Sequence, residues 1–306
     1  MSELLPITSK YFDPTTDFGF KKLFGEEANK DLLKDFLNSI LPPHHQIKAL
    51  SFQKTEQLPD HEDERKTIYD VLCEDQSGER FIVEMQKAPM TYFMDRSVYY
   101  TTFPIQQQAP KGPWNFRLKP VYVIGILDFE YDKTISRWKE RRLLRSFSLR
   151  DDLGIQMMDN LHFIFLQLPF FTKKIDELDT QFDKWCYFLK NLETMDAIPA
   201  ILNEPIFQKA FDVATVNNMD KNDYILYQIS KSKKYDMEIF GQESFDRGKI
   251  EGKVEGKVEG KVEGKAESIL SIYSSGYSPS EISNMLKMPI EGVIDVLKNH
   301  GFTITD

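Results

Sequence analysis

The sequence is poor in cysteine and in long apolar runs, and both absences narrow the class of protein. Only two cysteines occur among 306 residues. Cys73 and Cys186 lie far apart in apolar company, so we expect two buried thiols in a reducing compartment rather than a disulfide. No run approaches the roughly 18 apolar residues that a membrane span needs. The first residues also lack the pattern of a signal peptide, so we expect a soluble, cytoplasmic protein without a membrane partner.

Net positive charge is lacking as well. The formal charge is −9, so a nucleic acid would be attracted only by a local concentration of cations. One segment, residues 137–150, provides such a concentration. It contains Arg137, Lys139, Arg141, Arg142, Arg145 and Arg150 against the single acid Glu140. Taken alone, the segment is either a solvated basic face or a track for phosphate groups.

Several common catalytic signatures are also missing. The five histidines do not have the spacing of a zinc site. The sequence contains no glycine-rich phosphate loop and no Gly-x-Ser-x-Gly nucleophile elbow. These absences argue against a zinc centre, a nucleotide-binding loop of that type and a serine hydrolase built on the elbow.

What the sequence does contain is an alternation of helical and strand patterns. A short helix is expected after Thr15, Thr16 or Asp17, any of which could cap it. A second helix should end before Pro42 and bury Leu32, Leu33, Phe36, Leu37 and Ile40. The patterns then predict strands within 49–58, 65–75 and 79–87, a helix within 91–103, strands within 119–129 and 160–171, and an amphipathic helix over 173–193. This order predicts a mixed α/β core.

The character of the sequence changes past Ser244. Residues 248–267 repeat the pattern Gly-Lys-x-Glu, and each glycine costs a helix about 1 kcal/mol relative to alanine. We therefore expect a marginal helix that is steadied by a partner or by a second copy of the chain. A capping box, Ser278 to Glu281, begins one of the short helices that follow. The expected domains are 1–243, a helical linker at 244–268 and a small helical module at 269–306, with a homo-oligomer formed through the repeat and the C-terminal helices.

The stretch RFIVEMQK, residues 80–87, places a carboxylate inside an otherwise apolar strand. Alternation puts Glu84 and Gln86 on the same face. If the preceding turn contains the three residues Gln76-Ser77-Gly78, Asp70 stands opposite Glu84, with Cβ atoms about 4.5–5.5 Å apart. If the turn contains only two residues, the register slips by one and the two carboxylates lie on opposite faces.

Two carboxylates that face each other across a sheet repel, so a purely structural core would not favour the pair. A divalent cation reverses this argument, because Mg²⁺ prefers one or two carboxylates together with water and a phosphate oxygen. The alternative is that one of the two acids lies at a solvent-exposed edge.

Three stretches together resemble a known family. TDFGFKKLFG, DVLCEDQSGERFIVEMQ and RSVYYTT are similar to motifs of the recombination-promoting nucleases and related transposases, within the PD-(D/E)XK nuclease superfamily. The resemblance covers roughly residues 8–235. It implies a restriction-endonuclease-like α/β core with the order αβββαβ and a mixed sheet, and metal-dependent hydrolysis of DNA with Mg²⁺ or Mn²⁺.

The resemblance also implies roles for individual residues. Asp70 and Glu84 match the two metal-binding acids, and Asp17 is the candidate for an additional acid from the first helix. Arg96, Tyr99 and Tyr100 lie on the helix that often supports the site. Gln86 stands where most superfamily members have lysine, although the Glu-x-Gln variant is common in the family that this chain resembles. Lys87 is adjacent but on the other face, and Lys21 or Lys22 are alternatives from the first helix.

Two readings of function follow. The first is a metal-dependent DNA endonuclease in which Asp70 and Glu84 are ligands, Gln86 orients water and Asp17 is an auxiliary acid. Its phosphate track would be formed by Arg137, Lys139, Arg141, Arg142 and Arg145. The second is a catalytically decayed nuclease fold that acts as a nucleic-acid-binding or assembly protein. An enzyme that acts on RNA also agrees with the sequence.

Overall fold

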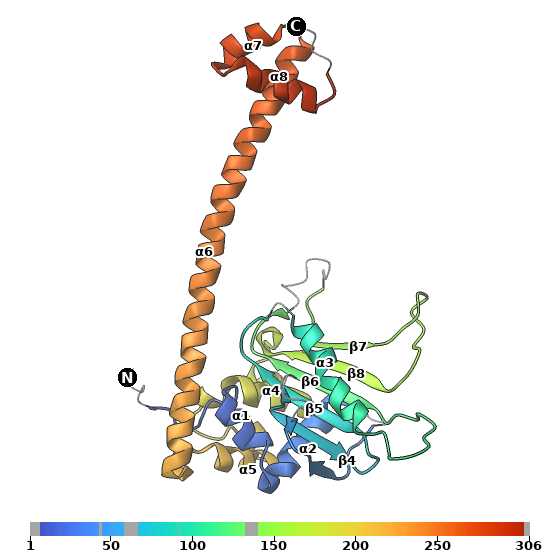
Figure 1. Cartoon of the computed structure of the whole chain (residues 1–306). Coiled ribbons are helices and arrows are strands. Elements are labelled where there is room, and N and C mark those ends of the chain that lie inside the picture. The colour runs from blue at the N-terminus through green and yellow to red at the C-terminus, as the bar shows by residue number, and fades with distance from the viewer. Residues whose placement is uncertain (1–6, 43–44, 58–66, 91, 132–139, 303–306) are drawn as a thin grey trace. The chain divides into compact units, whose positions relative to one another are not determined.

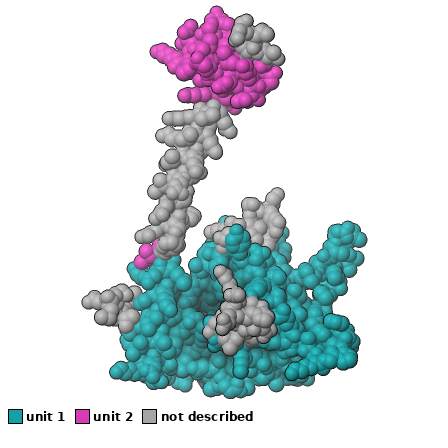
Figure 2. All heavy atoms as spheres, in the orientation of Figure 1, with its two compact units in different colours: residues 1–238 teal, residues 239–306 magenta. Residues whose placement is uncertain are grey.

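A computed structural model describes residues 7–42, 45–57, 67–90, 92–131 and 140–302 of the chain (Figure 1). The chain divides into two compact units, residues 1–238 and residues 239–306 (Figure 2). Within the described residues, no helix combines the length and the apolar character that a membrane span requires. The domain boundaries at residues 243 and 268 that we expect from the sequence stay predictions.

The described part of the first unit is built around a six-stranded mixed sheet with the strand order β1-β4-β5-β6-β8-β7. Its strands are β1 Leu50–Phe52, β4 Val71–Asp75, β5 Arg80–Gln86, β6 Val121–Leu127, β7 Leu144–Ser148 and β8 Leu161–Gln167. The central strands β5, β6 and β8 are parallel, and the other pairings are antiparallel. A separate ribbon pairs β2, Glu56–Gln57, with β3, Thr67–Ile68. The expected mixed α/β core is therefore present.

Helices cover both faces of the sheet (Figure 1). On one face lies α3, Phe93–Gln106, whose Phe93 and Tyr100 share a core with Ile82 of β5. The core of the other face is formed with α1 Asp17–Phe24, α2 Lys30–Ile40, α4 Gln181–Asn191, α5 Pro205–Ala214 and the first turns of α6 Lys221–Ser274. Short 3₁₀ segments are Glu27–Asn29, Leu168–Phe170, Ile175–Glu177, Leu192–Thr194, Ala200–Leu202 and Val216–Asn218.

The N-terminal helices form as their sequences predict. The Thr16 side chain caps α1 by accepting a hydrogen bond from the Gly19 N–H at 3.0 Å. Helix α2 buries the predicted face, Leu32, Leu33, Phe36, Leu37 and Ile40. The helix predicted over 173–193 is wrong in its first part. There, Thr180 and Asp183 form a capping box that begins α4 only at Gln181.

The hairpin of β4 and β5 has the register that the three-residue turn predicts. Val71 pairs with Val83 and Glu74 with Arg80, which brings Asp70, just before β4, opposite Glu84. The turn places Gly78 at φ 82°, in the left-handed region that a three-residue hairpin loop requires and that glycine adopts without strain. The alternative two-residue register is therefore wrong.

Strand β7, like helix α5 and the start of α6, is not among the elements that the sequence patterns predict. It lies at the edge of the sheet and pairs with β8, with Arg145 opposite Phe165. An edge strand tolerates basic side chains, which also discourage pairing with other chains. The segment that we read only as basic is thus partly a strand of the sheet.

The second unit contains the end of α6 and two short helices, α7 Pro279–Leu286 and α8 Ile290–Asn299. The predicted capping box is present, because the Ser278 hydroxyl and the Glu281 carboxylate cap α7 reciprocally. A small core joins Ile269, Ile282, Val293 and Leu297. Helix α6 includes the repeat at 248–267, but the side chains of residues 240–263 are not described, so association through the repeat stays a prediction.

Candidate active site

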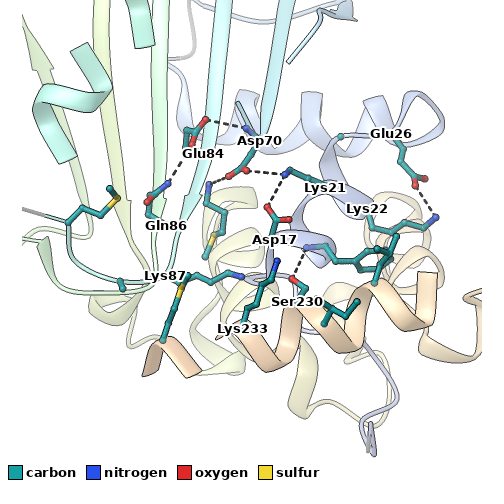
Figure 3. A pocket seen from close by; sticks show the side chains of 18 of the residues that line it. Asp17, Lys21, Lys22, Glu26, Asp70, Glu84, Gln86, Lys87, Ser230 and Lys233 are labelled. Atoms are coloured by element: carbon teal, nitrogen blue, oxygen red, sulfur yellow. Dashed lines mark hydrogen bonds and ion pairs between the residues drawn. The ribbon is translucent and has the colours of Figure 1, made fainter. Parts of the chain in front are cut away.

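A cleft of about 780 Å³ opens in the first unit, between α1, the end of β5, α3 and α6 (Figure 3). Its polar lining is formed by Asp17, Lys21, Lys22, Glu26, Asp70, Glu84, Gln86, Lys87, Arg96, Ser230 and Lys233. Asp17, Asp70, Glu84 and Gln86, which lie up to 69 positions apart in sequence, thus line one cleft. The structure brings together all four residues that the sequence analysis assigned to catalysis.

Asp70 and Glu84 face each other at the open end of the β4–β5 hairpin. The Asp70 backbone N–H donates to Glu84 Oε1 at 3.2 Å, and the Met85 N–H donates to Asp70 Oδ2 at 2.9 Å. The Glu84 residue is 4 % exposed, and the Asp70 side chain is 17 % exposed. Each carboxylate therefore has one oxygen fixed by the backbone, which leaves Asp70 Oδ1 and Glu84 Oε2 directed to other groups.

Burial makes the charged form of this pair unfavourable. Desolvation, and then the charge of Asp70, raise the pKa of Glu84 to about 8, although the Asp70 N–H and Arg96 act in the opposite direction. Desolvation also raises the pKa of Asp70, with a further contribution from the charge of Asp17. Two acids whose pKa values are raised in one cleft are typical of a functional site rather than of a structural ion pair.

Lys21 lies between two of the acids (Figure 3). Its Nζ is 2.9 Å from Asp17 Oδ1 and 3.5 Å from Asp70 Oδ1. Asp17 and Lys21 are separated by one turn of α1, so the helix itself sets their pairing. Asp17, which the family resemblance implies as an auxiliary acid, thus has the Lys21 ammonium as its partner.

Helix α3 supports Glu84 from the other side. Arg96 Nη2 is 3.8 Å from Glu84 Oε2, and Arg96 Nε donates to the Tyr100 hydroxyl at 2.7 Å. The amide of Gln86 contacts Glu84 Oε2 only at 3.5 Å. Arg96 and Tyr100 therefore occupy the supporting position expected for them. Tyr99 instead packs its ring against Phe103.

Helix α6 forms a wall of the cleft, which the sequence analysis did not foresee. The Ser230 hydroxyl accepts a hydrogen bond from the Phe18 N–H at 3.0 Å, and the buried Tyr227 hydroxyl accepts one from the Asp13 N–H at 2.8 Å. Lys234 is 2.8 Å from Asp13 Oδ2. No motif in this part of the sequence indicates where the helix packs.

The proposed basic track is not part of the cleft lining in the described residues. Arg137 and Lys139 lie outside the described residues. Arg142 forms an ion pair with Glu140, and Arg145 donates to the Glu140 carbonyl at 2.7 Å. Arg141 is exposed. The track therefore stays a prediction.

Arg145 nevertheless lies in the same row of residues as Glu84, that is, the residues paired with one another across neighbouring strands. Glu84 pairs with Gly125, Gly125 with Phe165, and Phe165 with Arg145. Three strand spacings correspond to about 14 Å. A Cβ on Gly125 would lie 3.1 Å from the Phe93 ring, so the first residue of α3 packs closely on this row between its two polar ends.

Residues 14–243 match the model of the PD-(D/E)XK nuclease family transposases. The chain belongs to this family. No curated protein and no solved structure matches the chain. The six-stranded mixed sheet agrees with a PD-(D/E)XK fold, and the family places the protein among nucleases and transposases, which act on DNA and generally use divalent metal ions.

The donor set of the PD-(D/E)XK cleft fits a divalent cation. Among the described residues, no uncharged hydrogen-bond donor lies within 3.4 Å of Asp70 Oδ1 or of Glu84 Oε2. Both are hard oxygen ligands of the kind that Mg²⁺ prefers. A cation between them would offset the burial and the repulsion by Asp70 that together raise the pKa of Glu84. Asp70 and Glu84 are thus the residues that would hold the metal.

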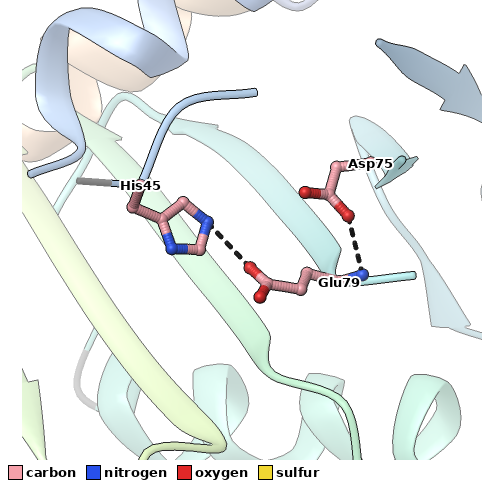
Figure 4. A group of neighbouring side chains, drawn as sticks. All are labelled: His45, Asp75 and Glu79. Carbon is pink, nitrogen blue, oxygen red and sulfur yellow. Dashed lines mark hydrogen bonds and ion pairs between the residues drawn. The ribbon is translucent and has the colours of Figure 1, made fainter. Parts of the chain in front are cut away.

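A second group of potential ligands lies at the turn end of the same hairpin (Figure 4). Atoms of His45, Asp75 and Glu79 all lie within 4.8 Å of one another. However, Asp75 Oδ1 accepts hydrogen bonds from the Ser77 and Glu79 N–H groups, and Glu79 Oε2 lies 2.7 Å from His45 Nε2. Hydrogen bonds thus compensate Asp75, whereas Glu79 depends on its ion pair with His45, and desolvation raises the pKa of Glu79. The three residues are a second candidate set of metal ligands.

Proposed function

We propose that the protein is a metal-dependent DNA endonuclease that hydrolyses phosphodiester bonds, in the manner of recombination-promoting nucleases. The observation that carries the proposal is the pair of the buried Glu84 and the partly exposed Asp70 in a cleft that also contains cationic side chains. The family supports a nuclease or transposase acting on DNA. The metal, Mg²⁺ or Mn²⁺, and the endonucleolytic mode are the parts that we propose.

The residues of the cleft have distinct roles in this proposal. A bound divalent cation would neutralise the carboxylates and polarise the phosphate. Asp70 and Glu84 hold it, each fixed through one oxygen by a backbone N–H. Gln86, on the same face as Glu84, orients the attacking water through its amide. In the reaction a water oxygen bonds to phosphorus, one P–O ester bond breaks, and the proton of the water reaches the leaving oxygen through solvent.

The basic segment is the proposed route of the nucleic acid away from the cleft. Arg145 supports this role, because it lies in the same row of the sheet as Glu84. Arg137, Lys139, Arg141 and Arg142 would extend the contact along the backbone. Since Phe93 packs between the two ends of the row, a bound strand would have to pass above the first turn of α3. Phosphate contacts of this kind make binding strongly dependent on salt.

The test is cleavage of plasmid DNA and of a matched RNA by the full chain with Mg²⁺ or Mn²⁺. The wild type should nick the plasmid, and Asp70→Asn should reduce the rate at least about 100-fold. Equal rates in the wild type and the variant would refute the site. If the wild type cleaves no nucleic acid with either metal, the decayed-nuclease reading replaces this proposal; if it cleaves only RNA, the substrate is wrong.

Self-association through the repeat at 248–267 and the helices after it is a further part of the proposal. The small core of Ile269, Ile282, Val293 and Leu297 supports a folded module at this end of the chain. The mass of the particle in solution, measured for the full chain and for a chain that ends at residue 244, tests the idea. A full chain that is monomeric at all concentrations would refute it.

A further inference from the structure

Asp70, Glu84 and a metal ion between them do not supply all the positive charge that the reaction needs. One divalent cation and two ionised carboxylates sum to a neutral centre, yet a phosphodiester brings a negative charge that increases as water attacks. A fixed cation near the phosphate is therefore required to stabilise the transition state. The sequence offers no such group at residue 86, which is an uncharged glutamine.

Five basic side chains line the cleft, namely Lys21, Lys22, Lys87, Arg96 and Lys233. Two of them already have close partners. Lys22 lies 2.9 Å from Glu26 and 2.8 Å from Asp223. Arg96 stacks on the Tyr100 ring, 4.8 Å from its centroid, binds the hydroxyl of the same side chain, and has Nη2 3.8 Å from Glu84 Oε2.

Lys87 and Lys233 line the cleft (Figure 3) but form no ion pair with Asp70 or Glu84 within the described residues. Among the described lysines of the cleft, only Lys21 has its ammonium near a metal-ligand oxygen, at 3.5 Å from Asp70 Oδ1. Its stronger contact, at 2.9 Å, is to Asp17. The Lys21 side chain is 41 % exposed, so a substrate can reach it.

We propose that Lys21 is the cation that contacts the scissile phosphate, and that Asp17 positions it. This inference rests on the proposed nuclease function. Asp17 holds the ammonium from one turn earlier on α1, while the longer contact with Asp70 can be exchanged for a phosphate oxygen. Lys21 keeps its proton throughout, and it acts only by its charge and its hydrogen bonds. The auxiliary acid is then an anchor for a lysine rather than a third metal ligand.

The experiment compares Lys21→Met with the neighbouring Lys22→Met, which removes the same charge from the same helix. Cleavage with Mg²⁺ at saturating DNA should fall at least about 100-fold for Lys21→Met and less than about threefold for Lys22→Met. Lys21→Arg should recover part of the loss because it retains the charge. Unchanged cleavage in Lys21→Met, or an equal loss in Lys22→Met, would overturn the proposal. So would a comparable loss in Lys87→Met without a loss in Lys21→Met.

A measurement of metal binding distinguishes a phosphate contact by Lys21 from a purely structural role of Lys21. Mn²⁺ binding, measured by calorimetry without DNA, should be as tight or tighter in Lys21→Met, because the variant removes a positive charge next to Asp70. If Lys21 merely held Asp70 in place, Mn²⁺ affinity and cleavage would fall together, and the proposal would be wrong.

A third measurement is independent of cleavage. With Ca²⁺ in place of Mg²⁺, a short fluorescent DNA should bind Lys21→Met about tenfold more weakly than the wild type, and Lys22→Met about equally well. If the wild type cleaves nothing, the nuclease proposal fails, but this arm still decides whether Lys21 contacts phosphate. Equal affinity of all three proteins would overturn that contact.

Discussion

The two ends of the β4–β5 hairpin present the same motif in two different environments. At the open end Asp70 stands opposite Glu84, and at the turn end Asp75 stands opposite Glu79 in the same register. Because the two pairs lie five positions apart along each strand, an odd offset, they point to opposite faces of the sheet. The residue types are identical, and only the surroundings differ.

At the turn end the protein itself compensates the acids. Asp75 accepts hydrogen bonds from the Ser77 N–H, the Ser77 hydroxyl and the Glu79 N–H, and Glu79 pairs with His45. At the open end each acid has one backbone donor, and within the described part of the chain the nearest cations lie 3.5 Å from Asp70 and 3.8 Å from Glu84. An acidic pair is therefore structural where donors surround it, and available for ligands where they do not.

The largest expected effect is on catalysis. Glu84→Gln should lower the rate of plasmid cleavage at least about 100-fold, because it removes a metal ligand. Glu79→Gln, the same change at the other end of the hairpin, should keep the rate within about tenfold. Comparison of initial rates at equal enzyme and Mg²⁺ concentrations measures both. The opposite order would identify His45, Asp75 and Glu79 as the metal site.

The next largest effect is on stability. Here the acid at the turn end should matter more than the acid at the open end. Asp75→Ala should lower the free energy of unfolding by about 2–3 kcal/mol, because it leaves the Ser77 and Glu79 N–H groups without their acceptor. Asp70→Ala should cost less than about 1 kcal/mol, since it removes one acceptor together with a poorly solvated charge. Urea unfolding without added metal measures the difference. Equal losses would show that the two ends are not distinct.

A smaller effect depends on pH. The folded-state pKa of Glu84, about 8, lies above its ordinary value of 4.5, so the folded protein retains a proton that the unfolded chain releases. This group therefore stabilises less as the pH rises from about 4.5 to 8. Glu84→Gln lacks the penalty and should be more stable than the wild type at pH 8 by about 1–2 kcal/mol, with little difference at pH 5.

Thermal melting at pH 5 and pH 8 checks this prediction. Added Mg²⁺ should raise the melting temperature of the wild type at pH 8 by mass action and should not raise that of Glu84→Gln. A variant that is less stable than the wild type at pH 8 without metal would contradict the assigned cause.

The smallest effect concerns the turn. Gly78 has φ 82°, and Gly78→Ala should reduce stability by about 1 kcal/mol through backbone strain. Cleavage should persist, because the turn residues are not among the described residues that line the cleft. Loss of cleavage with a folded protein would show that the strain is relieved by a change of register.

The sequence was sufficient where the determinants are local. The Thr16 cap, the apolar face of α2 and the three-residue turn before β5 each depend on residues within a few positions of one another, and all three are present. The turn then fixed which acids meet. The late start of α4 was the local failure, because the capping box at Thr180 outweighed the apolar pattern before it.

The parts of the site that could not be predicted depend on distant contacts. Nothing near Ser230 indicates that its hydroxyl will cap the Phe18 N–H, 212 positions away. Lys21 and Lys22 are neighbours with the same chemistry, and only packing decides that one reaches Asp70 and the other Asp223. Strand β7 was hidden because its basic side chains suit an edge and give no clear alternating pattern.

The three-residue turn at 76–78 has a consequence for how this site can change over time. None of its residues lines the cleft, yet its length determines the face on which Glu84 emerges relative to Asp70. Deleting one residue there would dismantle the acidic pair as completely as mutating an acid. Relatives with a turn of even length should therefore carry one of the two acids shifted by one position. In such comparisons a gap at the turn is as informative about activity as a substitution in the cleft.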